Sequence, residues 1–404
     1  MQLKHIFLTS SFVFALVLLA QAQIAVKGEM VYTMDRDPIE NGVVLIKDGK
    51  ITAVGASSAI TIPVGYTVHE GKVVTPGLVD AHSMVGVSGM YNQPWDQDQL
   101  ETSAAIQPEL QAVDAYNPIE PLIGFLMSRG VTTIHTGHGI GALVSGQTMI
   151  VKTRGNSVEE AIIEPATMLA MTLGQTVTSN YKKPGTRSKG MAMIRGQLIK
   201  AQEYQAKKKK EPSTSTDLGM EALSKLLSGE YKALITVHRS SDIMSALRLA
   251  DEFGFKLVLD GAAESYMMIE EIKASGAEII LHPTNMRIYG SGPEYANGSM
   301  ETAGKLHEAG IPVVIQSGFE QYVPKTRVVL YEAALAAANG LPFNEALRAI
   351  TINAAKVLEI DDRVGSLTVG KDADVVIYDG DPFEYVTHVC TVIIDGEVTH
   401  SECK

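Results

Sequence analysis

The residues of this sequence that are best suited to chemistry lie at the ends of short apolar runs. They are Asp80, His82, His135, His238 and Asp260. Imidazole and carboxylate groups bind divalent cations, and a bound cation lowers the pKa of water and polarises a carbonyl group. A neighbouring carboxylate or imidazole accepts the proton that the water loses. Residues of these types therefore point first to metal-assisted hydrolysis.

The elements that must position these residues alternate along the middle of the chain. Between residues 76 and 365, apolar runs typical of buried strands are followed by stretches with the pattern of helices. This alternation is typical of a parallel sheet or barrel. Barrel strands present reactive side chains at their carboxyl ends, so the site is expected there. The sequence predicts an α/β fold, specifically a (β/α)8 TIM barrel over residues 76–365.

Both ends of the chain carry shorter, alternating apolar patterns. Within residues 23–75 and again within residues 366–404, an Asp-Gly pair lies among β-rich runs, at Asp48 and at Asp395. Such pairs are signals for tight hairpin turns. We therefore expect the two ends to assemble one small β-sandwich beside the barrel.

Residues 1–22 have the pattern of a secretory signal peptide. Lys4 precedes a continuous apolar run, and Ala20 and Ala22 give the small-x-small spacing of a cleavage site. A membrane anchor is the alternative, but an apolar run of about 15 residues is short for a span. We expect removal of this segment, export to a bacterial periplasm or cell surface, and no membrane span in the mature chain.

Composition excludes one class of partner and leaves one covalent question open. The 404-residue chain is 45% hydrophobic and 20% charged, with a formal net charge of −12. A nucleic-acid partner requires a basic face, so none is expected. Cys390 and Cys403 lie close together near the end of the chain. Export permits a disulfide between them, but their spacing does not decide whether one forms.

Two motifs identify the chain as a relative of a known family. They read Pro76-Gly77-Leu78-Val79-Asp80-Ala81-His82 and Gly370-Lys371-Asp372-Ala373-Asp374. These resemble the first barrel strand and a scaffold motif of the amidohydrolase superfamily, especially its imidazolonepropionase-like members. The resemblance covers nearly the whole mature chain. It implies the barrel with its small sandwich, a divalent metal centre, and hydrolysis of C–N bonds in cyclic amides or peptidic substrates.

The chain departs from this family at most of the positions that bind metal or act as base. His82 and His238 stand where the family has ligands. The four replaced positions are the second histidine of the first strand, now Met84, a lysine that is absent from residues 165–174, the sixth-strand histidine, replaced at Asp260, and the eighth-strand aspartate, now Gly318. That aspartate is also the family's general base. The chain thus retains two of the six site positions and lacks the base.

These replacements leave two hypotheses for function. In the first, the chain is a pseudoenzyme that binds a small-molecule ligand, supports an intact amidohydrolase homologue or self-associates, with no cofactor or a weakly held divalent ion such as zinc. In the second, it is an active hydrolase whose reduced or relocated metal site uses His82, His135, His238 and Asp260. The scaffold motifs are intact while the site motifs are lost, which favours the first hypothesis.

Several residues also have purely structural interpretations. His135 is expected to bond to backbone, and Asp260 to be a buried or capped carboxylate without a charged partner that the sequence reveals. The four lysines at residues 207–210 are expected to lie on a solvated, mobile connection rather than in an anion-binding patch. Trp95, on a loop over the expected mouth, lines a ligand pocket, seals a partner interface or simply packs within its loop.

Overall fold

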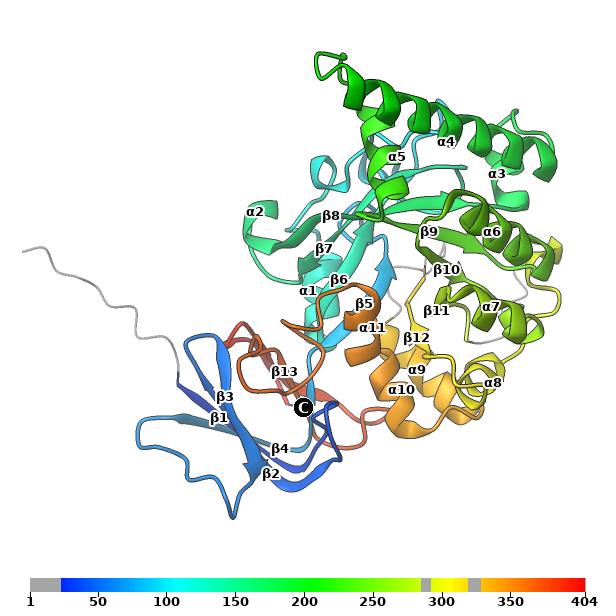
Figure 1. Cartoon of the computed structure of the whole chain (residues 1–404). Helices are drawn as coiled ribbons and strands as arrows, with labels where there is room; N and C mark the ends of the chain where they lie inside the picture. The colour runs from blue at the N-terminus through cyan, green and yellow to red at the C-terminus, as the bar shows by residue number, and fades with distance from the viewer. Residues whose placement is uncertain (1–22, 285–291, 319–327, 404) are drawn as a thin grey trace, which may run out of the picture.

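The computed structural model of the chain describes residues 23–284, 292–318 and 328–403. Two sheets organise the molecule, an eight-stranded sheet curled into a nearly closed barrel and a seven-stranded sheet made from both ends of the chain (Figure 1). The fold class predicted from the sequence is confirmed. The predicted signal peptide, residues 1–22, lies outside the described residues. No helix in the described part of the chain is long and apolar enough to cross a membrane.

The seven-stranded sheet, called here the terminal sheet, joins the two ends of the chain. Its strands, in spatial order, are β15 (Glu397–Ser401), β14 (Val389–Ile394), β13 (Val375–Tyr378), β4 (Thr67–Pro76), β1 (Ile24–Val31), β2 (Ile39–Lys47) and β3 (Lys50–Ala56). The turn between β2 and β3 places Asp48 and Gly49 at φ values of 53° and 74°, the left-handed backbone that a tight hairpin requires. Pairing of β13 with β4 brings the late strands against the early ones.

The barrel strands follow one another around the second sheet. They are β5 (Leu78–Ser83), β6 (Val131–Gly137), β7 (Gly146–Lys152), β8 (Ile162–Thr172), β9 (Lys232–Val237), β10 (Leu257–Gly261), β11 (Glu278–Leu281) and β12 (Val314–Ile315). Most are buried along their whole length, which explains why the sequence shows continuous apolar runs rather than alternation. Branched side chains such as Val79, Ile150 and Val258 fill the interior.

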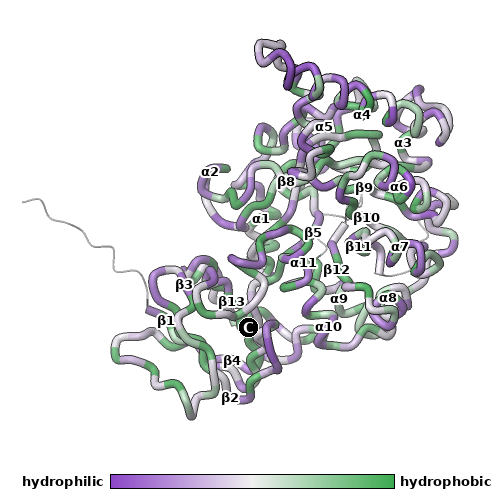
Figure 2. Tube along the Cα trace, in the orientation of Figure 1, coloured by the Kyte–Doolittle hydropathy of each residue, from purple (hydrophilic) through white to green (hydrophobic). Residues whose placement is uncertain are grey.

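Helices cover the outside of the barrel. They are α1 (Pro121–Ser128), α2 (Val158–Ala161), α3 (Gln175–Asn180), α4 (Arg187–Lys210), α5 (Leu218–Ser228), α6 (Ser240–Phe253), α7 (Ile269–Ser275), α8 (Thr302–Glu308), α9 (Val329–Ala338), α10 (Phe343–Ala349) and α11 (Ile352–Val357). Figure 2 shows hydrophilic residues along the outward faces of α4 and α6, while the strands beneath them are mostly hydrophobic. This is the layering expected of helices packed around a barrel.

One strand breaks the regular alternation that the sequence predicted. β7 runs antiparallel to both β6 and β8, whereas the other neighbouring pairs of the barrel are parallel. An antiparallel neighbour needs only a short connection, so residues 138–145 join β6 to β7 without a helix. The prediction of strict alternation was wrong here because an apolar run carries no information about strand direction.

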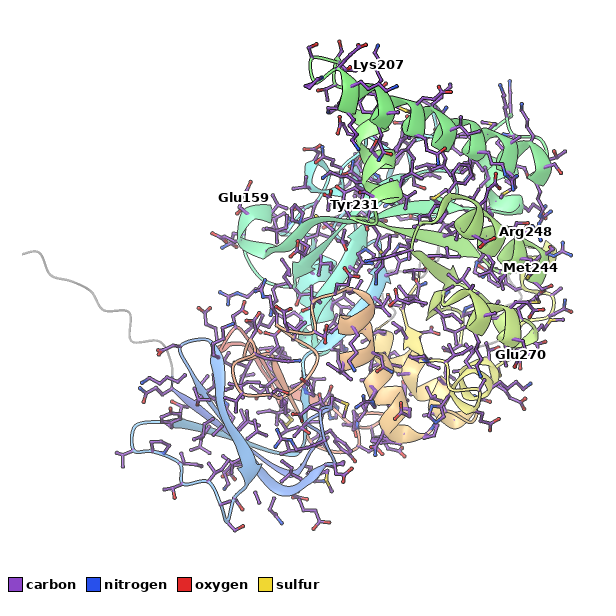
Figure 3. All side chains as sticks on the ribbon, viewed as in Figure 1. Glu159, Lys207, Tyr231, Met244, Arg248 and Glu270 are labelled. Carbon is purple, nitrogen blue, oxygen red and sulfur yellow. A yellow bond between two sulfur atoms is a disulfide. The ribbon has the colours of Figure 1, made fainter. Side chains whose placement is uncertain are left out.

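The four lysines at residues 207–210 are helical rather than part of a loop. They form the last turn of α4, where positive side chains interact favourably with the helix dipole. Lys208 also pairs with Glu221 of α5, which packs against α4. Figure 3 shows Lys207 at the outer end of α4, away from the barrel. The prediction of a mobile connection was therefore wrong for these residues.

A buried lysine ties the terminal sheet to the barrel. Lys152, at the end of β7 and 3% exposed, lies 2.6 Å from Asp374, 3.2 Å from Asp395 and 3.4 Å from Asp372. Asp372 and Asp374, which belong to the second sequence motif, therefore have a structural role. A buried cation requires such counter-charges because isolated charges are costly to remove from water.

Candidate site at the barrel mouth

The carboxyl ends of the barrel strands, called here the barrel mouth, collect polar side chains from distant parts of the sequence. They are Asp80 and His82 of β5, His135 of β6, His238 after β9, Asp260 of β10, His282 after β11, and Gln316 after β12, and each is at most 8% exposed. The sequence placed the first five at strand ends, and the structure does the same.

His82 and Asp260 are in direct contact at the centre of this group. The Nδ1 atom of His82 lies 2.9 Å from Oδ1 of Asp260, and both side chains are at most 2% exposed. Thr236 donates a hydrogen bond of 2.6 Å to the other carboxylate oxygen, and the amide of Gln316 donates to Oδ1. The sequence revealed no charged partner for Asp260, because that partner lies 178 residues away in sequence.

The contact favours an ion pair. Burial alone lowers the pKa of His82, but the Asp260 carboxylate outweighs burial and the net pKa is raised above its ordinary 6.5. Burial alone raises the pKa of Asp260, but His82 and the hydrogen bonds from His82 and Thr236 bring the net pKa below 3.8. The contact therefore favours the imidazolium form of His82 and the carboxylate form of Asp260, because each stabilises the charge of the other.

Asp80 links the first and last strands of the barrel. Its Oδ1 atom accepts a hydrogen bond of 3.1 Å from the backbone of Ser317, so β5 is joined to the segment after β12. Burial raises the pKa of Asp80 to about 6, although hydrogen bonds from Ser317 and the charge of His82 act in the opposite direction.

His135 is fixed within the barrel wall. Its Nδ1 atom lies 2.7 Å from the backbone oxygen of Ala81, as the structural interpretation expected, and its Nε2 atom lies 2.6 Å from the hydroxyl of Thr148. Burial, together with the charge of His82, lowers its pKa to about 3. The ring centres of His135 and His82 are 5.8 Å apart. His135 is thus a neutral neighbour of the ion pair with both nitrogens engaged.

His238 is covered by a tyrosine that the sequence did not single out. The hydroxyl of Tyr295 lies 3.1 Å from Nε2 of His238, and their rings are 4.3 Å apart. Burial and the proximity of His282 lower the pKa of His238 to about 3, so it is neutral and accepts the tyrosine proton in a hydrogen bond. Burial raises the pKa of Tyr295 to about 12, which keeps its hydroxyl protonated.

The segment around Tyr295 is held to the mouth at three points. Glu294 accepts from Arg187 at 2.7 Å and from the backbone of Gln175 at 3.1 Å. Asn297 donates to Glu264 at 3.0 Å. Tyr295 is the central contact of the three. No sequence pattern marked this segment, because it follows no strand and its partners come from three other parts of the chain.

The side chain missing at Gly318 leaves space that a histidine fills. A β-carbon built at Gly318 would lie 2.4 Å from Nε2 of His282 and 2.5 Å from its Cε1 atom. The backbone there has a φ of 74°, which also favours glycine. Gly318 and the position of His282 are therefore coupled.

Comparison with known proteins identifies the family. The Amidohydrolase family profile matches residues 73–399. The chain belongs to the amidohydrolase family. It is 24% identical over 386 residues to the imidazolonepropionase of Streptococcus pyogenes serotype M6, covering 86% of each chain. It is 26% identical over 392 residues to Amidohydrolase tasK of Hapsidospora irregularis, covering 88% of this chain and 39% of that longer protein.

Solved structures agree with this assignment. An amidohydrolase from Thermotoga maritima MSB8 is 30% identical with a TM-score of 0.87, covering 94% of this chain and all of that one. A zinc-bound adenosine deaminase from Xanthomonas campestris is 16% identical with a TM-score of 0.53, covering 94% and 93%, and shows the shared fold alone. The chain is an imidazolonepropionase-like amidohydrolase, as the motifs predicted. Membership of this family supports hydrolysis of C–N bonds as the type of activity. Members of the family generally use a divalent metal such as zinc.

Met84 stands at a family position, and Met168 lies within the stretch 165–174 that lacks the family's lysine; both side chains are packed in this structure. Met84 is 3% exposed, and a β-carbon at Gly139 would lie 2.8 Å from its sulfur, so the thioether packs against the loop after β6. In β8, Met168 is 1% exposed and belongs to the apolar interior of the barrel with Leu234. A thioether is a weak ligand for zinc, and these side chains fill space.

The residues of the mouth do not fit the family's two-metal centre. His135 uses both nitrogens for hydrogen bonds. His82 uses Nδ1 for Asp260 and keeps Nε2 without a protein partner, an arrangement that metal-bound histidines also show. Among the residues that the structure describes, one set of three His, Cys, Asp or Glu side chains brings its ligand atoms within 4.8 Å of one another, and it lies in the terminal sheet. The relocated metal site therefore has no preformed trio at the described mouth, and no catalytic step through a metal follows from this arrangement.

The mouth nevertheless keeps unused capacity for hydrogen bonds. Oδ2 of Asp80, Nε2 of His82 and Nδ1 of His238 are buried atoms without a protein partner. Buried polar atoms in native proteins are usually satisfied by protein, water or a bound molecule. These unpartnered atoms therefore suit a small polar ligand with hydrogen-bond donors and acceptors.

We predict that the His82–Asp260 pair is strongly coupled. His82→Gln or Asp260→Asn alone should cost about 3–5 kcal/mol of unfolding free energy, because each leaves a buried charge without its partner. The double variant should cost clearly less than the sum, measured by urea unfolding. Additive costs would contradict an ion pair.

The same coupling should depend on pH. The contribution from the raised pKa of His82 is fully present below 6.5 and is lost as pH rises through the folded value. The contribution from the lowered pKa of Asp260 is present above 3.8 and is lost as pH falls through the folded value. Coupling measured by the double-mutant cycle should thus be largest between these limits and decline at alkaline pH.

We also predict that Gly318 cannot regain a side chain without loss. Gly318→Ala should destabilise the protein by about 1–3 kcal/mol more than Gly310→Ala, because both glycines have positive φ but only the former meets another side chain. Thermal or urea unfolding measures the difference. The double variant Gly318→Ala/His282→Ala lacks the imidazole ring and should recover part of the lost stability. Equal losses of stability in Gly318→Ala and Gly310→Ala would show that the contact with His282 does not matter.

Proposed function

We propose that this chain is an exported, non-hydrolytic member of the amidohydrolase family that binds a small polar molecule at the barrel mouth. The observation that carries the proposal is the buried contact between His82 and Asp260, which raises the pKa of the imidazole. A metal ligand must offer a lone pair, whereas an imidazolium offers only N–H donors. A proton held on His82 by Asp260 would supply positive charge where the family uses a cation.

Glycine at the position of the family's base supports the same conclusion. Metal-assisted hydrolysis needs a group that accepts a proton from water. Gly318 stands at the position of the family's base, and the ring of His282 lies against it. Asp260 already accepts hydrogen bonds from His82, Thr236 and Gln316, which stabilise its charge and lower its tendency to take a proton from water.

The surroundings of the mouth favour binding over turnover. Tyr295 covers His238, and its segment is anchored through Glu294 and Asn297. The unpartnered atoms of Asp80, His82 and His238 offer specific hydrogen bonds to a ligand that enters. Support of an intact homologue or self-association is the alternative role, and an absence of any small-molecule ligand would favour it. Export rests on residues 1–22 alone.

We predict low metal content and no metal-dependent hydrolysis. Mature protein purified without chelators, reductants or affinity-tag histidines should contain less than about 0.1 equivalent of Zn, Fe, Mn or Ni by mass spectrometry, also after incubation with metal and desalting. Hydrolysis of cyclic amides and N-acyl dipeptides should equal that of a His82→Gln/His238→Gln variant. His69→Gln, which changes a histidine of the terminal sheet, is the matched control.

A metal stoichiometry near one that is lost in the His82 and His238 variants would overturn the proposal and favour the active hydrolase. Ligand binding has its own measurement, a thermal-shift screen of small neutral and zwitterionic amides. A true ligand at a hundred times its Kd should stabilise the protein by about 2.7 kcal/mol. That shift should disappear in Asp80→Asn or His238→Gln.

A further inference from the structure

A second cluster of chemically capable side chains lies in the terminal sheet, away from the barrel mouth. Cys390 is on β14, Cys403 follows β15, and Asp379 follows β13. All three line an open groove of about 540 Å³, whose other walls come from the neighbouring early strands. The C-terminus lies beside this sheet (Figure 1). None of these residues contributes to the site described above.

The three side chains converge within ligand distance. Cys390 and Cys403 form a disulfide, which settles the question that the sequence left open. One carboxylate oxygen of Asp379 and the two sulfur atoms all lie within 4.8 Å of one another. These atoms are close enough to bind one metal ion together once the sulfur–sulfur bond has been opened and the two sulfur atoms have moved apart.

Local structure holds the carboxylate in place. His388 donates its backbone N–H to Oδ1 of Asp379 at 2.7 Å, and its Nδ1 atom lies 3.0 Å from Oδ2. His388 and Cys390 are two residues apart at the start of β14, so their side chains leave the same face of the sheet. A histidine that supports a ligating carboxylate is a common feature around bound metals.

We propose that reduction of the Cys390–Cys403 disulfide creates a zinc site made of both thiolates and the Asp379 carboxylate, with water as the fourth ligand. Two thiolates and an oxygen suit tetrahedral zinc. A dithiol reduces the disulfide to two thiols and is itself oxidised to a disulfide. Zinc then displaces one proton from each thiol. The segment after β15 is therefore cross-linked to β14 in both redox states, by the disulfide in the oxidised form and by zinc in the reduced form.

The physical reason for a cross-link here is the position of Cys403. It lies just beyond β15, an edge strand whose residues are mostly half-buried or exposed. Next to it, the backbone of Glu402 donates a hydrogen bond to that of Cys390, and Ser401 pairs with Thr391 of β14. A covalent or metal bridge keeps this edge attached, since an unrestrained terminus frays readily.

The test compares oxidised and reduced full-length protein. A phosphine reductant, which is oxidised to its oxide, opens the disulfide and is removed anaerobically before Co²⁺ or Zn²⁺ is added. The reduced protein should bind one more equivalent of metal than the oxidised protein. Bound Co²⁺ should show a near-ultraviolet thiolate charge-transfer band and the visible spectrum of tetrahedral coordination.

Variants decide which side chains form the site. Cys390→Ser/Cys403→Ser should abolish the added equivalent, and Asp379→Asn and His388→Ala should each weaken zinc binding by at least about tenfold. Glu70→Gln is the matched control, because Glu70 lines the same groove outside the cluster, and should leave binding unchanged. Equal metal binding by oxidised and reduced protein overturns the proposal, as does full affinity in Asp379→Asn. Neither result bears on the barrel mouth.

Discussion

A charge buried inside a barrel requires an opposite charge within reach, and the His82–Asp260 pair meets that requirement. Thr236 and Gln316 fix the carboxylate, so the imidazolium has one well-defined partner. The same low-polarity surroundings make further charge expensive. His135 and His238 are accordingly neutral, with burial lowering the pKa of each to about 3. Burial thus favours neutral forms at these positions, and the contact between His82 and Asp260 favours charge.

Packing and electrostatics depart from the family in a coordinated way. Gly318 removes a carboxylate, and the ring of His282 lies in the space that its side chain would need. Met84 and Met168 stand near other lost ligands and are packed as apolar side chains. Because protein interiors are close-packed, each of these positions constrains its neighbours. Restoring a single ligand would therefore meet a steric or charge conflict rather than rebuild a metal centre.

The overall fold was predictable because its signals are local. Asp48 and Asp395 marked turns of the terminal sheet, and continuous apolar runs marked buried strands. The direction of β7 was not predictable, since apolar runs look alike in parallel and antiparallel strands. The helical state of residues 207–210 was missed because polarity was taken as a sign of a loop, although lysine is a good helix former at a C-terminal turn.

The candidate site was predictable only as a set of residue types at strand ends. His82 and Asp260 are 178 residues apart, so no spacing rule pairs them. Tyr295, Thr236 and Gln316 act through contacts that depend on the closed barrel. Their residue types are common and carry no signal by themselves. The sequence predicts which ligand positions of the family are replaced, but only the folded chain shows what packs at those positions.

The central claim is that a proton on His82 stands where the family places a metal. Nitrogen NMR of histidine-labelled protein, with His82 assigned through His82→Gln, measures this directly in the disulfide-bonded form. The account predicts that both ring nitrogens of His82 are protonated at mildly acidic to neutral pH and that added zinc leaves their shifts unchanged. A neutral His82 ring, with one nitrogen shifted by stoichiometric zinc, would contradict it.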